Sequence, residues 1–167
     1  MEALALTDIN NMYGAIEFSN ACHHYDIKPI FGMQGDVLID QEVYPFLFYA
    51  KDQIGYHDLM KICSDINLSE RKAIELERLS LYREHLFILS GCKEGIVERL
   101  VLKELESEAL KYIALFKKMF KDNYYICIQD HHLKMQSFLN ERLKALATLQ
   151  EVKVCASNEV RYLYPQD

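Results

Sequence analysis

Short apolar segments alternate along this chain with longer amphipathic ones, and polar turns separate them. The short segments have the length and continuous hydrophobicity of buried β-strands, whereas the longer ones carry apolar residues at helical spacing. Strands are predicted over residues 3–7, 28–32, 36–40, 44–50, 85–90, 124–129 and 152–157. Helices are predicted over residues 12–25, 55–66, 94–105, 107–121 and 133–149, with a further helix opening at 69–72. Repeated strand–helix pairs predict a mainly parallel sheet with helices outside it.

Polar residues at the predicted boundaries set where helices begin and strands turn. Asn10 or Asn11 is available to cap the helix that follows the first strand, and Ser69 and Ser107 are predicted caps of two later helices. Residues 41–42 are the predicted turn between two strands, and Gly32 is expected to end the strand over 28–32.

Length and composition place the chain among folded domains. Half of its 167 residues are hydrophobic, which is enough for a substantial core, and no repeat or linker divides it. We therefore predict one domain over residues 1–167. No apolar run approaches the roughly 20 residues that cross a bilayer, and the N-terminus does not resemble a signal peptide. These features predict no membrane contact.

The cysteines and the net charge indicate the cellular compartment and the kind of partner. The five cysteines are scattered without a C-x-x-C pair, which favours reduced thiols in the cytoplasm. The formal charge is −6, and the lysines between residues 117 and 121 lie on a predicted amphipathic helix rather than in a basic stripe. Direct binding of nucleic acid by this segment is therefore not expected.

Polar, metal-capable side chains follow successive predicted strands. The carboxyl ends of parallel strands share one edge of a sheet, so these side chains are expected to converge there. They are Asp8, Gln34, Asp36, Cys92, Asp130, His131, His132, Asn158 and Glu159. The pattern predicts a barrel-like fold with a polar mouth.

Five segments of the chain resemble motifs of one known family, in the same order and with near-correct spacing. The segment TDINNMYGA, which begins at Thr7, closely resembles the TDHGNMYGA motif of the PHP (polymerase and histidinol phosphatase) domain of bacterial DNA polymerase III alpha subunits. The segments IKPIFG, LFILSGCKEG, DNYYICIQDHH and VCASNEVRYLYPQD resemble later motifs of that domain. The resemblance covers nearly the whole chain.

The resemblance implies an α/β fold of the PHP type, a distorted (β/α)7 barrel that here lacks its first strand. That strand ends in H-x-H in the family and lies upstream of the residues given, so we expect an N-terminally truncated, partial PHP domain without the polymerase domains. Removal of a strand from a closed barrel exposes two edges. Self-association through such an edge, or marginal stability, is therefore expected.

The same resemblance implies a set of metal-ligand positions. Asp8, Cys92, His131 and Glu159 occupy ligand-type positions and are suitable donors. Ile9, Gln34 and Arg161 stand where the family has other ligands: Ile9 cannot donate, Gln34 replaces a glutamate unless Asp36 takes its place, and Arg161 adds a repelling charge. We therefore expect a vestigial site without catalytic residues or a bound metal, or Zn, Mn or Mg if the site still functions.

The implied function is that of a fragment of a DNA polymerase III alpha subunit, a DNA-directed DNA polymerase of replication. Its PHP domain is expected to be degenerate and to support the rest of the polymerase chain and a partner such as the proofreading subunit. The alternative is a metal-dependent phosphoesterase or 3′–5′ exonuclease. Simpler roles also stay open: Asp8 as a helix cap, Cys92 as a packed small residue, and Arg161 paired with Glu159 or Asp8.

Overall fold

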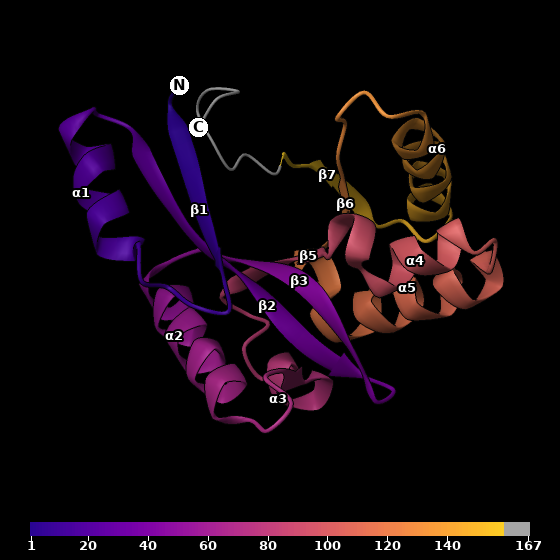
Figure 1. The fold of residues 1–167 in the computed structure, drawn as a ribbon, viewed down its shortest axis with the longest axis horizontal. Coiled ribbons are helices and arrows are strands. Elements are labelled where there is room, and N and C mark those ends of the chain that lie inside the picture. Colours follow the sequence, from indigo (N-terminus) through magenta and orange to yellow (C-terminus); the bar gives the residue numbers. More distant parts are fainter. Residues whose placement is uncertain (159–167) are drawn as a thin grey trace.

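The computed structural model describes residues 1–158, which form a curled, mostly parallel sheet with helices along its outside (Figure 1). The strands are β1 Ala3–Ile9, β2 Lys28–Ile39, β3 Glu42–Ala50, β4 Ile74–Glu75, β5 Leu86–Ser90, β6 Tyr124–Ile128 and β7 Lys153–Ala156. The α-helices are α1 Ala15–His24, α2 Gln53–Leu68, α3 Leu76–Ser80, α4 Ile96–Leu102, α5 Glu106–Phe120 and α6 Lys134–Leu149, and short 3-10 helices, η1 Cys92–Glu94 and η2 Lys121–Asn123, precede α4 and β6. The predicted α/β class is confirmed.

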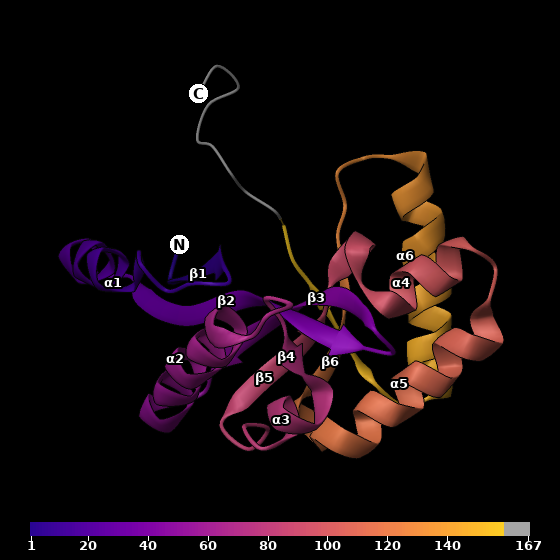
Figure 2. The ribbon, with the colours of Figure 1, turned by 60° about the horizontal axis from the view of Figure 1, so that its bottom comes forward.

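The sheet runs in the order β1-β2-β3-β5-β6-β7, with the short β4 paired to β2. The pairs β1/β2, β2/β4, β5/β6 and β6/β7 are parallel, whereas β3 is antiparallel to both of its neighbours. The result is a half-barrel, as expected from the predicted barrel fold. Figure 2 shows α4, α5 and α6 grouped at one end of the sheet, with α1 and α2 at the other.

Strand β2 is longer than predicted, because the two strands expected over 28–32 and 36–40 form one continuous strand that ends at Ile39. Gly32 does not end the strand. A Cβ atom at Gly32 would lie 2.7 Å from the carbonyl oxygen of Phe48, so glycine permits the close approach of β3. The strand ends instead at a two-residue reversal, where Asp40 and Gln41 both have positive φ, 48° and 70°. This backbone is typical of a tight β-hairpin.

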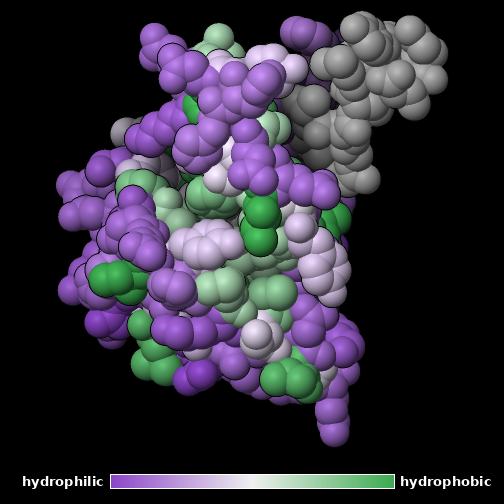
Figure 3. Space-filling model, turned by 90° about the vertical axis from the view of Figure 1, so that its left-hand side faces the viewer, coloured by the Kyte–Doolittle hydropathy of each residue, from purple (hydrophilic) through white to green (hydrophobic). Residues whose placement is uncertain are grey.

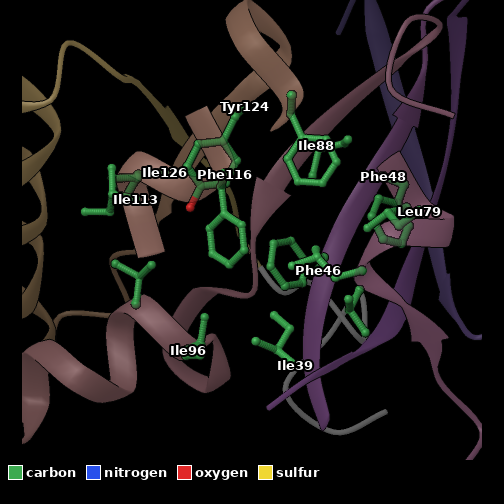
Figure 4. Close-up of a cluster of buried hydrophobic side chains, with 14 of the residues drawn as sticks. Ile39, Phe46, Phe48, Leu79, Ile88, Ile96, Ile113, Phe116, Tyr124 and Ile126 are labelled. Carbon is green, nitrogen blue, oxygen red and sulfur yellow. The ribbon is translucent and has the colours of Figure 1, made fainter. Parts of the chain in front are cut away.

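Strand β3 divides its side chains between two environments. Phe46 and Phe48 are 1% and 0% exposed and face the helices, whereas Leu47 and Tyr49 line the opposite, concave face. In the core, the rings of Phe46 and Phe116 meet edge to face with 5.3 Å between their centroids (Figure 4). Because Phe116 lies on α5, this contact joins the outer helices to the middle of the sheet.

Two predicted helix starts are wrong. No helix opens at 69–72; Ser69 is the C-cap of α2, and its hydroxyl accepts the backbone N–H of Ala73 at 3.0 Å. A serine hydroxyl that bonds the backbone locally stabilises a turn as readily as a helix start, which explains the error. Ser107 lies inside α5, whose N-cap residue is Leu105 without a side-chain cap.

The outer surface is mixed in character. On the face shown in Figure 3, hydrophilic residues surround a central area where less polar residues gather. Tyr13 and Ile16, near the start of α1, are 92% and 72% exposed. Among the helices formed by residues 1–158, none combines the length and hydrophobicity needed to cross a bilayer.

Candidate functional site in the concave groove

The concave face of the half-barrel holds a broad groove of about 1920 Å³. Its walls come from all the long strands of the sheet, from α1 and from the segments that follow β5, β6 and β7. Six of the predicted site residues line it, among them Asp8, Gln34, Cys92 and His131. The strand ends place these residues along the same face of the sheet. Ile9 and Asn158 line the groove as well.

Asp8 lies near the C-terminal end of β1, directly before the turn into α1. Its Oδ2 accepts the backbone N–H of Gly14 at 3.3 Å. Gly14 is the N-cap residue of α1, so the carboxylate stands at the positive end of that helix. The helix-start role considered for Asp8 therefore has a hydrogen bond to support it, while the side chain also borders the groove.

Gln34 and Asp36, the two candidates on β2, have different surroundings. Gln34 faces the groove, whereas the carboxylate of Asp36 is held by Asn10, whose Nδ2 donates to Oδ2 at 2.8 Å. The backbone N–H of Asp36 donates in turn to Oδ1 of Asn10 at 3.0 Å. Asp36 is thus engaged by Asn10, and it is not among the described residues that line the groove.

His131 is fixed by Gln136, a residue of α6 that the sequence reasoning missed. The backbone N–H of His131 donates to Oε1 of Gln136 at 2.8 Å, so the amide nitrogen of Gln136 must face Nδ1 of the ring, at 2.9 Å. An amide nitrogen only donates, which makes Nδ1 the acceptor and leaves the proton of a neutral ring on Nε2. Histidine ligands need the reverse arrangement when they bind metal through Nε2. The neighbouring His132 is solvent-exposed, with 94% of its side chain accessible.

Three cysteines that are scattered in the sequence gather at the groove. Sγ of Cys92 lies 2.7 Å from Sγ of Cys127, and Cys127 is the register partner of Cys155 on the neighbouring strand. Burial, and then the neighbouring Cys127, raises the pKa of the Cys155 thiol. The phenol of Tyr49 lies close by: burial first, then the three sulfur atoms, raises its pKa to about 12. In the sequence, the sole sign of this cluster is that each of its cysteines lies in a predicted strand or shortly after one.

The donor set of the described residues does not fit a metal cluster. Among residues 1–158, no three His, Cys, Asp or Glu side chains converge closely enough to hold a metal ion. Asp8, Cys92 and His131 each contact a protein partner instead. Glu159 and Arg161, the remaining ligand position and the substituted one, lie outside the described residues, as does any pairing between them.

Comparison of the sequence with known proteins identifies the family of this chain. Residues 1–131 match the PHP domain. The chain belongs to the PHP domain family. The matched PHP region contains Asp8, Cys92 and His131, while Glu159 lies beyond it.

Three relatives extend the similarity to the full chain. It is 31% identical to the DNA polymerase III subunit alpha of Borreliella burgdorferi, over 100% of this chain and 16% of that protein. It is 31% identical to the same subunit of Bacillus subtilis, over 99% of this chain and 15% of the relative. The subunit of Treponema pallidum is 32% identical over 99% of the chain and 16% of its own length. The chain thus spans about one-sixth of the length of these curated relatives.

Proposed function

We propose that this chain is the PHP portion of a DNA polymerase III alpha subunit and that it is a structural, partner-binding module rather than a catalyst. The similarity of this chain, over essentially its whole length, to three such subunits supports this assignment of the parent protein. That parent would carry out DNA-directed DNA synthesis in replication. The partners of the module are then the remainder of the polymerase chain and a proofreading subunit.

The non-catalytic role rests on one observation: the candidate metal ligands already contact other groups of the protein. A metal cluster that hydrolyses phosphoesters lowers the pKa of a bound water and clamps phosphate oxygens, which requires several donors at fixed geometry. Here Gln136 holds His131 with the wrong nitrogen protonated for binding through Nε2. The carboxylate of Asp8 accepts the backbone N–H of Gly14 at the start of α1. Ile9 stands at a position where the family motif has histidine.

Charge and cysteine chemistry support two further parts of the proposal. The chain carries a formal charge of −6, which opposes a direct contact with nucleic acid. No disulfide joins any of the five cysteines, all of which lie within residues 1–158, as is usual in the reducing cytoplasm, where we place the protein.

The first prediction concerns metal content. We expect purified chain, dialysed against Mn²⁺ or Zn²⁺ and then against buffer, to retain well under one equivalent of metal by elemental analysis. Phosphatase turnover of p-nitrophenyl phosphate should not rise when metal is added. The matched variant Asp8→Asn should give the same two results, because Asp8 is not expected to hold a metal. In ¹⁵N NMR, Nδ1 of neutral His131 should show the shift of an unprotonated nitrogen.

The opposite outcome would favour the alternative function. Stoichiometric metal together with metal-dependent turnover, both lost in Asp8→Asn, would identify a phosphoesterase or 3′–5′ exonuclease that uses Asp8, Cys92, His131 and Glu159. The groove in which the first three of these residues lie is the observation that keeps this alternative in view.

A further inference from the structure

Two cysteines at the groove lie within bonding reach of one another. Cys92 begins η1, separated from the end of β5 by one residue, and Cys127 lies in β6. Their Sγ atoms are 2.7 Å apart, about 0.7 Å more than the length of a disulfide bond. The two sulfur atoms therefore have only this short distance to close before they can bond.

The backbone around the two cysteines is held in place by packing. The hydroxyl of Ser90, a residue 2% exposed, accepts the backbone N–H of Cys127 at 2.9 Å. Gly91 follows, and a Cβ atom there would lie 2.0 Å from the carbonyl oxygen of Pro45. Cys92 then adopts a left-handed backbone with φ 50°, a conformation that few residues other than glycine adopt. These constraints direct the side chain of Cys92 toward Cys127.

The two sulfur atoms differ in their access to reagents. Cys92 is partly exposed and lines the groove, whereas Cys127 is 1% exposed beneath it. Cys155 lines the groove as well. A small disulfide that enters the groove therefore meets Cys92 or Cys155 before it can meet Cys127.

We propose that Cys92 and Cys127 form a disulfide bond when the folded chain meets a low-molecular-weight disulfide such as oxidised glutathione. The sulfur of Cys92 attacks the small disulfide, its S–S bond breaks, and one glutathione thiol leaves. Cys127 then attacks the Cys92 sulfur of the mixed disulfide and releases the second glutathione thiol. The two protein thiols are oxidised, the small disulfide is reduced, and the two thiol protons pass to the leaving thiolates.

The bond would change the site in a defined way. It occupies the sulfur of Cys92, so this atom can no longer serve as a ligand, and it ties the turn after β5 to β6. A lone oxidised Cys92 would instead hold a bulky adduct in the groove. The proposal does not depend on whether the module is catalytic, because it concerns only the contact between the two thiols.

The test uses the intact chain under native conditions. We expect treatment with oxidised glutathione, followed by alkylation and mass spectrometry, to show a loss of two hydrogens and two protected cysteines. Peptide mapping should join Cys92 to Cys127. The mass change should be absent in Cys92→Ser and Cys127→Ser, and Cys127→Ser should accumulate a glutathione adduct on Cys92.

Two variants keep the test informative if a serine at the bridge disturbs folding. Cys155→Ser retains both proposed partners, and Cys63→Ser alters a thiol of α2 outside the cluster; both should form the bridge as the parent chain does. A bond between Cys127 and Cys155, a stable adduct on Cys92 of the unaltered chain, or five alkylated cysteines after treatment would each overturn the proposal.

Discussion

Glu98 is a buried carboxyl group in α4, next to the cysteine cluster but outside the candidate site. It is 0% exposed, the hydroxyl of Ser90 donates to its Oε1, and its Oε2 has no hydrogen-bond partner among residues 1–158. Burial raises the pKa of Glu98 from 4.5 to about 7, against the opposing effect of Ser90. The group is therefore largely protonated in the folded chain below neutrality.

This pKa shift predicts a pH dependence of stability. Because the folded-state pKa lies above the unfolded one, the contribution of Glu98 is fully present below pH 4.5 and falls as pH rises to about 7. The loss is roughly 3 kcal/mol for a shift of this size. Denaturant unfolding at pH 5 and pH 8 should show a smaller difference for Glu98→Gln than for the parent chain. The exposed control Glu141→Gln should behave as the parent does. If Glu98→Gln shows the same difference in unfolding free energy between pH 5 and pH 8 as the parent, the prediction is refuted.

At the residue scale, the sequence indicates which side chains reach the groove but not what they contact there. Asp8, Gln34, Cys92 and His131 follow apolar segments, and this alone predicts their location. The contact between His131 and Gln136 depends on how the first turn of α6 packs, and that of Cys92 with Cys127 on the register of β5 and β6. No local pattern encodes either distance.

At the element scale, the side chain and backbone of Asn10 join three elements. The side chain bonds Asp36 of β2, and its backbone carbonyl accepts the Nδ2 of Asn67 of α2 at 2.8 Å. Its φ of 54° is left-handed, which explains why the related family motif has glycine at this position. The residue therefore acts as a junction, and not as the helix cap considered from the sequence.

Loss of this junction should destabilise the chain. We expect Asn10→Ala to lower the free energy of unfolding by about 1–3 kcal/mol, because Asp36 loses two hydrogen bonds and alanine tolerates positive φ poorly. Asn11→Ala is the matched control, since within residues 1–158 the side chain of Asn11 bonds only nearby backbone groups, at Ile9 and Tyr13. Urea unfolding measures both. Equal effects of the two substitutions would show that the contact with Asp36 contributes little.

The order of strands and helices follows from hydrophobic periodicity, whereas several boundaries do not. A glycine in a strand and a serine after a helix each have two common roles, and only contacts with distant residues decide between them. Gly32 continues β2 because Phe48 lies against it, and Ser69 closes a turn because Ala73 returns to it.

At the scale of the whole molecule, the outer edge of β1 is an exposed surface. Among the described residues β1 pairs only with β2, and it carries neither lysine nor proline, the residues that usually protect such an edge. Leu4 in this strand is 42% exposed. We propose, as the fold class suggests, that the isolated chain associates with itself through this edge.

Sedimentation over a range of concentrations tests the association. The parent chain should shift from monomer toward larger species as its concentration rises, and Leu4→Lys should raise the dissociation constant by about tenfold or more, because a charge at the edge opposes strand pairing. Leu115→Lys, on α5 at 39% exposure, is the matched control and should have no effect. A parent chain that stays monomeric throughout would remove the proposal.

The two-residue reversal at Asp40 and Gln41 determines which side chains of β3 face the helices and which face the groove. Side chains of a strand alternate with period two, so a shift of β3 by one residue after an insertion there would turn Phe46 and Phe48 into the groove and Leu47 and Tyr49 toward the helices. This short hairpin is therefore the place where the chain tolerates a change of residue type far better than a change of length. Across homologous chains, its spacing should vary less than its composition.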